Sequence, residues 1–176
     1  MGYQEKLYGN LWWIVAALAL VVVALWGNKY KNSLIEVKVI ETAILQPACD
    51  LRQAPCTARF ADGDSITLEI DPKYIPLLEP LKLIVTLRNN SYPETVKIDV
   101  QFEGTNMEMP FIRSTLHPLP PQAQDQKNIQ KDQKVYSGKA ILPVCTLQRM
   151  EWEARLSIQT PMGIKVAIFP FYTLKN

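Results

Sequence analysis

A series of short segments in which apolar and polar residues alternate recurs about every ten residues between positions 57 and 173. In residues 95–102 (TVKIDVQF), an extended chain places the apolar residues on one face and the polar residues on the other. Turn signals such as DGD, NNSYP and TPMG separate the segments. This spacing predicts an all-β sandwich or barrel. The predicted strands are TARF, SITLEI, LKLIVTLR, TVKIDVQF, VYSGKAIL, EWEARLSIQT and IKVAIFPFYT.

Three other stretches are less regular. Residues 33–45 (SLIEVKVIETAIL) predict a connector or a first strand. Residues 75–83 (IPLLEPLKL) cannot form a central strand before Pro80, because three prolines fall within residues 72–80. We expect this stretch to cross from one sheet to the other. Residues 117–134 are rich in Pro, Gln and Lys and predict a mobile hairpin insertion.

An apolar run covers residues 7–27 and contains one polar residue, Asn10. At 1.5 Å per residue a helix of this length spans roughly 31 Å, about the thickness of the hydrocarbon layer. Trp12, Trp13 and Trp26 would lie near the two interfaces. A cleaved signal peptide is the alternative, but ALWGNKY offers no small-residue cleavage site. The sequence therefore predicts a single transmembrane anchor within residues 1–31, followed by a β domain at residues 32–176.

The charges bear on orientation and on partners. Lys6 precedes the apolar run, and Lys29 and Lys31 follow it, so the positive-inside rule leaves the orientation open. Setting aside these lysines and Glu5 leaves 16 of the 19 basic and 16 of the 17 acidic residues. A β domain without net charge argues against nucleic acid as a partner.

Cysteine spacing suggests an oxidising compartment. Cys49 and Cys56 flank DLRQAP, a turn-like stretch, and this spacing can close a small disulfide loop. Cys145 is then left over, either as a buried thiol or as a partner of one of the other two, since three thiols allow three single bridges. The C-x6-C spacing is not that of a structural zinc site.

Catalytic signals are weak, and we expect the protein not to be an enzyme. The single histidine, His117, begins the stretch rich in Pro and Gln, where a general base would lack a rigid support. There is no glycine-rich phosphate loop and no H-E-x-x-H pattern.

Two methionines stand one residue apart in GTNMEMPFIR. On a strand, Met107 and Met109 would share a face with their Cα atoms roughly 6.6 to 7 Å apart, while Glu108 would face away. Soft thioethers select Cu(I), and Cys145, His117 or Met150 could complete the ligand set. The alternative is that both methionines fill gaps in the core.

A metal-free role is the second hypothesis. The segments IFPFYT and LEPLKL could form an apolar surface that docks on another membrane protein. A bitopic anchor with a neutral domain suits an accessory subunit of a membrane complex.

Taken together, the anchor, the G-x-x-M-x-M motif, Y-S-G-K-A-I-L-P-V-C and M-E-W-E-A-R-L-S-I resemble the FixH-like and YtkA-like membrane-anchored domains of bacteria. The resemblance covers roughly residues 65–172. Its matching positions are Gly104, Met107, Met109, Tyr136, Gly138 and Trp152.

The resemblance implies an immunoglobulin-like β-sandwich in the periplasm, anchored in the bacterial inner membrane. It also implies a role in copper handling or in assembly of a respiratory haem-copper oxidase, with another membrane protein or respiratory complex as partner. The expected Cu(I) ligands are Met107 and Met109, then Cys145, with His117 as a fourth. A tryptophan at the position of Trp152 is expected to pack in the core.

Overall fold

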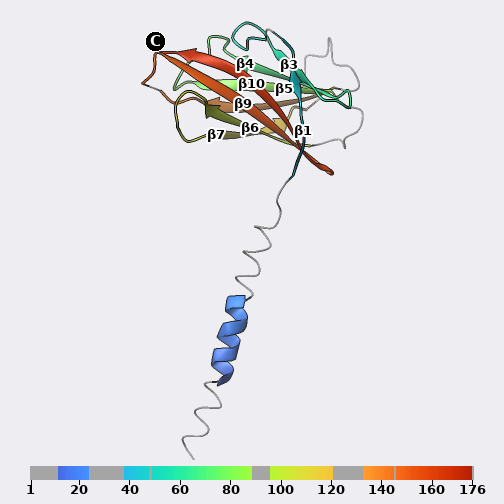
Figure 1. The fold of residues 1–176 in the computed structure, drawn as a ribbon, viewed down its shortest axis with the longest axis vertical. Helices are drawn as coiled ribbons and strands as arrows, with labels where there is room; N and C mark the ends of the chain where they lie inside the picture. Colours follow the sequence, from blue (N-terminus) through green and yellow to red (C-terminus); the bar gives the residue numbers. More distant parts are fainter. Residues whose placement is uncertain are drawn as a thin grey trace, which may run out of the picture. The chain divides into compact units, whose positions relative to one another are not determined.

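Ten β-strands joined into one sheet make up the regular structure in the described part of residues 38–176 (Figure 1). The computed structural model describes residues 12–23, 38–47, 49–88, 96–120, 133–144 and 146–175, and the chain divides into two units, residues 1–37 and 38–176. The predicted all-β fold is confirmed. The strands are β1 (Val39–Thr42), β2 (Ile44–Leu45), β3 (Cys56–Arg59), β4 (Ser65–Asp71), β5 (Pro80–Arg88), β6 (Lys97–Gly104), β7 (Ile112–Pro118), β8 (Gln133–Ile141), β9 (Arg149–Thr160) and β10 (Gly163–Leu174).

The sheet consists of two halves that share one core. Its order is β1-β10-β9-β6-β7-β8-β5-β4-β3-β2, and β1 pairs with β10 in parallel. Strands β7 and β8 are joined by only two residue pairs, His117 with Ser137 and Pro118 with Tyr136. Buried side chains from strands on both sides of this short ladder form a single hydrophobic cluster. Strand β10 of the first half also contacts β2 and β3 of the second.

All seven predicted strands are present, because their alternation matches the burial pattern. In β9, for example, the residues from Met150 to Ile158 alternate between buried and partly exposed. Strand β7 was missed, and His117 lies within it rather than in a loop. Residues 133 and 134 likewise belong to β8, and residues 121–132 of the predicted insertion lie outside the described residues.

The stretch at residues 75–83 differs from its prediction in one respect. Strand β5 begins at Pro80, as the prolines predict. However, the stretch does not cross between sheets, because β4 and β5 are antiparallel neighbours with Asp71 opposite Lys82. The connection contains two non-glycine residues with positive φ, Ile75 (46°) and Leu78 (60°). Such conformations cost about 1 to 3 kcal/mol each, so the surrounding contacts must hold them in place.

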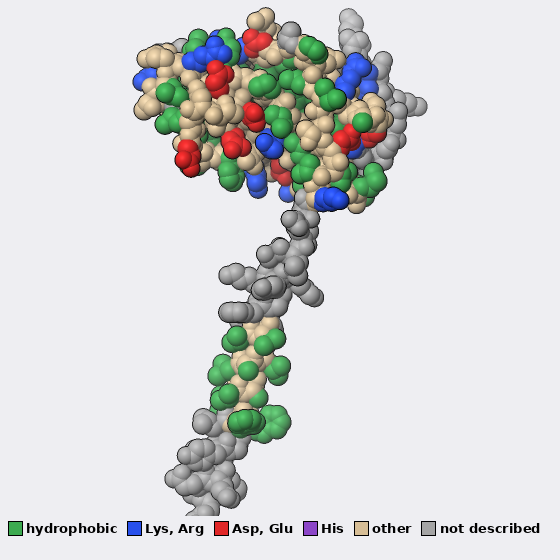
Figure 2. All heavy atoms as spheres, in the orientation of Figure 1, with side chains coloured by type: hydrophobic (Ala, Val, Ile, Leu, Met, Phe, Trp, Pro, Cys, Tyr) green, Lys and Arg blue, Asp and Glu red, His purple; other side chains and the backbone are tan. Residues whose placement is uncertain are grey.

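Within unit 1 the described residues are 12–23, and they form a helix covered with hydrophobic side chains (Figure 2). No helix in the described parts of the chain has both the length and the apolar character needed to cross a membrane. Residues 7–11 and 24–27 of the predicted anchor lie outside the described residues, so the anchor stays a prediction.

Candidate metal-binding site

Two methionine side chains from distant parts of the sequence meet at Gly104, the last residue of β6. A Cβ atom added to Gly104 would lie 2.2 Å from Cε of Met150 and 3.1 Å from Sδ of Met109. It would also lie 3.1 Å from the carbonyl oxygen of Met107. The missing side chain of Gly104 therefore makes the space into which the methyl end of Met150 and the sulfur of Met109 both extend.

Asn106 holds the chain after β6 against the start of β9. Its side-chain nitrogen donates to the carbonyl oxygen of Arg149 at 3.2 Å, and its side-chain oxygen accepts from the N–H of Glu151 at 3.0 Å. The N–H of Thr105 donates to the carbonyl oxygen of Glu151 at 3.0 Å. The Asn106 amide thus pairs with the β9 backbone as another strand would, and this fixes residues 107–109 beside Met150.

The prediction that Met107 and Met109 lie on a strand is wrong. Strand β6 ends at Gly104 and β7 begins at Ile112, so both methionines lie in the connection between them. Two features explain the end of the strand. The side chain of Asn106, not a backbone ladder, makes the bonds to β9, and Pro110 has no N–H to donate.

The three methionines differ in exposure. Met150 is only 2% exposed and belongs to the hydrophobic core, Met109 is half-buried and packs against that core, and Met107 is 37% exposed. Residues 103–109 line an open depression of about 410 Å³ on the surface. The methionine side chains therefore range from Met150 in the core to Met107 and Met109 in the lining of the depression, which is open to a small ion or a partner.

His117 is far from the methionines. It lies near the opposite end of β6, since Leu116 pairs with Ile98 while Gly104 is the last residue of the strand. Six residues at about 3.3 Å each separate these positions by roughly 20 Å. The histidine therefore cannot share a metal ion with Met107 and Met109 in this fold.

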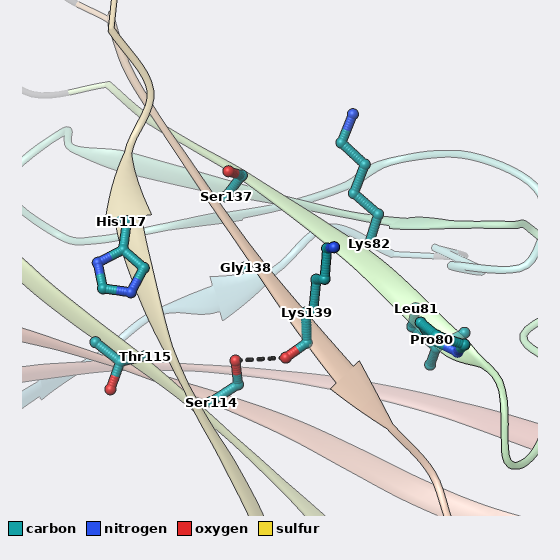
Figure 3. A pocket seen from close by; sticks show the side chains of 9 residues that line it. All are labelled: Pro80, Leu81, Lys82, Ser114, Thr115, His117, Ser137, Gly138 and Lys139. Atoms are coloured by element: carbon teal, nitrogen blue, oxygen red, sulfur yellow. Dashed lines mark hydrogen bonds between the residues drawn. The ribbon is translucent and has the colours of Figure 1, made fainter.

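Among the described residues, those that line the pocket beside His117 carry no sulfur. Figure 3 shows it on β7 beside Ser114 and Thr115, across from Ser137 and Lys139 of β8. These residues and Lys82 line a cavity of about 530 Å³, and none of the lining side chains is Cys or Met. Ser114 Oγ donates to the Lys139 carbonyl oxygen at 2.7 Å, which joins the two strands where their ladder ends.

The predicted disulfide between Cys49 and Cys56 is confirmed, with a Cα–Cα distance of 5.6 Å. Because these cysteines bond to each other, neither pairs with Cys145. Cys145 itself lies outside the described residues, so its relation to the methionines stays a prediction.

The other positions of the resemblance lie at tightly packed places. Trp152 is 1% exposed, stacks on Phe171 at a centroid distance of 6.4 Å, and donates its indole N–H to Thr173 Oγ1 at 3.0 Å. The buried Tyr136 accepts from the N–H of Val96 at 3.3 Å. A Cβ on Gly138 would lie 2.5 Å from Leu116 Cδ2, so a side chain there would crowd β7.

The apolar segments that were predicted to dock on a partner are largely internal. Phe169 and Phe171 of IFPFYT are buried, as is Leu81 of LEPLKL. Leu78 is 65% exposed. The surface of residues 38–175 mixes acidic and basic side chains on the face that Figure 2 shows.

The sulfur atoms at Gly104 determine which kind of metal ion could bind there. Thioether sulfur favours Cu(I) over Mg²⁺, Ca²⁺ or Mn²⁺, which prefer oxygen. Across the described residues, no group of three or more His, Cys, Asp or Glu side chains is arranged to hold a metal ion. Among the described residues at Gly104, the methionines are therefore the sulfur ligands open to a soft metal ion.

Sequence reasoning named Met150 only as one of several candidates and did not find Asn106. The M-x-M pattern lies 41 positions before Met150, and only the pairing of β6 with β9 brings them together. Comparisons with protein-family models, with curated proteins and with solved structures find no match to the chain.

Proposed function

We propose that this chain is a membrane-anchored bacterial copper-handling protein. Its immunoglobulin-like β-sandwich lies in the periplasm and binds Cu(I) through the sulfurs of Met109 and Met150. Met107 and Cys145 are further ligands of the same ion. The biological role is delivery of copper or assembly of a respiratory haem-copper oxidase, with a membrane protein or respiratory complex as partner.

The observation that carries the proposal is the convergence of Met109 and Met150 at Gly104. A glycine at the end of β6 leaves room for two thioethers, and Asn106 holds the connection that carries Met107 and Met109. The depression lined by residues 103–109 gives an ion or a partner access to this place. Neutral sulfur ligands next to an apolar core favour a soft monovalent ion such as Cu(I), because binding such an ion does not require a carboxylate ligand in the core.

The location and the finer fold are supported by separate features. The apolar run at residues 7–27 and the helix at residues 12–23 support an anchor in the inner membrane. The Cys49–Cys56 disulfide supports an oxidising compartment such as the periplasm. Two five-stranded halves around one core support a sandwich, and the resemblance supplies its immunoglobulin-like type.

A metal-free interaction module is the second candidate. The burial of Met150 favours it, because a side chain that is 2% exposed is also what an ordinary core methionine looks like. In that case the domain would hold or escort a membrane complex with the same fold, and the methionines would serve only packing.

Competition for Cu(I) separates the two candidates. The full chain, in lipid nanodiscs and under anaerobic conditions, is titrated with Cu(I) against a chromophoric chelator. Met109→Leu and Met150→Leu keep the apolar volume and remove the sulfur, so they should fold normally and bind Cu(I) at least tenfold more weakly. Met162→Leu is the matched control, because Met162 is exposed in the turn between β9 and β10.

The copper proposal predicts one equivalent of tightly bound Cu(I) in the wild type and in Met162→Leu. Equal affinities in the wild type and in the Met109→Leu/Met150→Leu double variant would contradict it and leave the interaction module. Cys145→Ser tests the predicted thiol ligand in the same assay.

A further inference from the structure

A third pocket, with no methionine in its lining, lies beside the connection between β4 and β5. Its volume is about 360 Å³, within the usual range for small-ligand sites. Its walls combine apolar side chains with two cations. They include Ile75, Val144 and Leu174 on the apolar side, and Arg52, Lys175 and Glu79 as charged groups.

Arg52 is held in the pocket wall by a rigid loop. It lies between the disulfide-bonded Cys49 and Cys56. Its backbone N–H donates to Asp50 Oδ1 at 2.9 Å, and the N–H groups of Gln53 and Ala54 donate to the Asp50 carbonyl oxygen at 2.9 and 3.1 Å. The loop therefore presents Arg52 in one position, and little side-chain or backbone ordering would be needed on binding.

The guanidinium of Arg52 is stacked and has unused hydrogen-bonding capacity. Its Cζ lies 4.3 Å from the centroid of the Tyr172 ring, within the range of a cation–π contact. Its Nε is buried without a hydrogen-bond partner, and among the described residues no carboxylate pairs with Arg52. A buried guanidinium nitrogen left unpaired is costly, so Arg52 has a hydrogen-bonding demand that the described residues do not meet.

The β4–β5 connection, which contributes Ile75 to the pocket lining, has a strained backbone. Ile75 and Leu78 both have positive φ, a region that a β-branched residue such as isoleucine almost never occupies. Ile75 donates its N–H to Pro72 at 3.0 Å, and Leu78 donates to Leu142 at 2.8 Å, so the fold holds this shape. Strain of this kind concentrates at ligand-binding places, where the surrounding contacts enforce it.

We propose that this pocket binds a carboxylate attached to an apolar group. The guanidinium of Arg52 pairs with the carboxylate, Lys175 adds a second positive charge, and the apolar side chains of Ile75, Val144 and Leu174 cover the apolar group. Glu79 at the same pocket disfavours a ligand with a second negative charge. Two sources share this chemistry, namely the carboxyl terminus of a polypeptide that ends in an apolar residue and a free short-chain carboxylic acid.

Ligand-observed NMR with the full chain in lipid nanodiscs tests the proposal. The probes are acetyl-Ala-Ala-Leu with a free carboxylate, the same peptide with a terminal amide, and hexanoate. We expect the acid peptide to bind and the amide to bind at least tenfold more weakly, because the amide cannot pair with the guanidinium. Binding of hexanoate as well identifies the site as a general carboxylate site, and binding of the peptide alone identifies a peptide-terminus site.

Three variants assign the binding to this pocket. Arg52→Gln should weaken the acid peptide at least tenfold. Val144→Trp keeps Arg52 and fills the pocket, so it should block binding of the acid peptide. This variant tests the pocket independently of any change that Arg52→Gln makes to the disulfide loop. Arg59→Gln, on an exposed position of β3, should bind as the wild type does. Equal binding of acid and amide, unchanged affinity in Arg52→Gln, or no binding of any probe would overturn the proposal.

Discussion

Replacing Lys165 by methionine tests how an ionic cluster stabilises the start of β10. The Lys165 side chain is 2% exposed, and its Nζ lies 3.2 Å from Glu41 Oε2 and 3.3 Å from Asp64 Oδ2, with Asp62 as a third partner. Nζ also lies 4.8 Å from the centroid of the Phe60 ring. The ammonium thereby joins β1, β10 and the turn between β3 and β4.

The expected cost follows from what the substitution leaves behind. Removing one member of a buried ion pair costs about 3 to 5 kcal/mol, because the remaining charge is left without compensation. Here Asp64 is 7% exposed and stays buried, whereas Glu41 and Asp62 are more exposed and can turn to water. We therefore expect about 3 kcal/mol, which corresponds to a fall of roughly 6 to 12 °C in the midpoint of thermal unfolding.

Urea unfolding of the full chain, followed by the far-ultraviolet circular dichroism of the sheet, measures this free energy. Lys73→Met is the matched control, because Lys73 pairs only across the surface with Glu69 at 2.9 Å and such pairs contribute less than about 1 kcal/mol. If Lys165→Met costs no more than Lys73→Met, the cluster does not stabilise the fold in the way described.

Two further variants probe the same cluster and the methionine site. Burial of Asp62 opposes its ionisation, but its hydrogen bond and charge interaction with Lys165 and the N–H of Asp64 together hold its pKa below the ordinary value. A carboxyl group whose pKa is lowered by folding stabilises the fold above about pH 4. The difference in urea midpoint between the wild type and Asp62→Asn should therefore shrink as the pH falls below about 4. A difference that widens instead would refute the assignment. Gly104→Ala should lower the free energy of unfolding by about 1 to 3 kcal/mol and weaken Cu(I) binding, because the new Cβ would overlap Cε of the buried Met150. Unchanged stability and affinity would show that the space at Gly104 is not needed.

The strands could be predicted because the burial of their side chains follows the alternation of apolar and polar residues in the sequence. Strand β7 could not, because it buries only Leu116 and its remaining residues are largely exposed, so the apolar pattern is absent. The spacing of Cys49 and Cys56 made this disulfide a candidate, but the sequence left three single bridges open and the structure selects one of them. The strand assignment of Met107 and Met109 was wrong because the alternation in M-x-M is the same as that of a strand. The strand ends where the Asn106 side chain bonds to β9, and the sequence around Asn106 does not show this distant contact.

The features that support the two proposals depend on tertiary register. Gly104 pairs with Trp152, and this register places Met150 next to the glycine. A lysine in a predicted strand is expected to face solvent, so the sequence did not predict the burial of Lys165. The pocket at Arg52 likewise depends on the disulfide loop, the β4–β5 connection and the end of β10 meeting at one place.

X-ray absorption at the copper edge identifies the atoms that bind Cu(I). In the full chain loaded with one equivalent of Cu(I), we expect the nearest scatterers to be sulfur atoms. The sulfur signal should persist in Met162→Leu and be reduced in the Met109→Leu/Met150→Leu double variant. A nearest shell of nitrogen or oxygen, or a sulfur signal that the double variant leaves unchanged, would contradict the assignment of Met109 and Met150 as ligands.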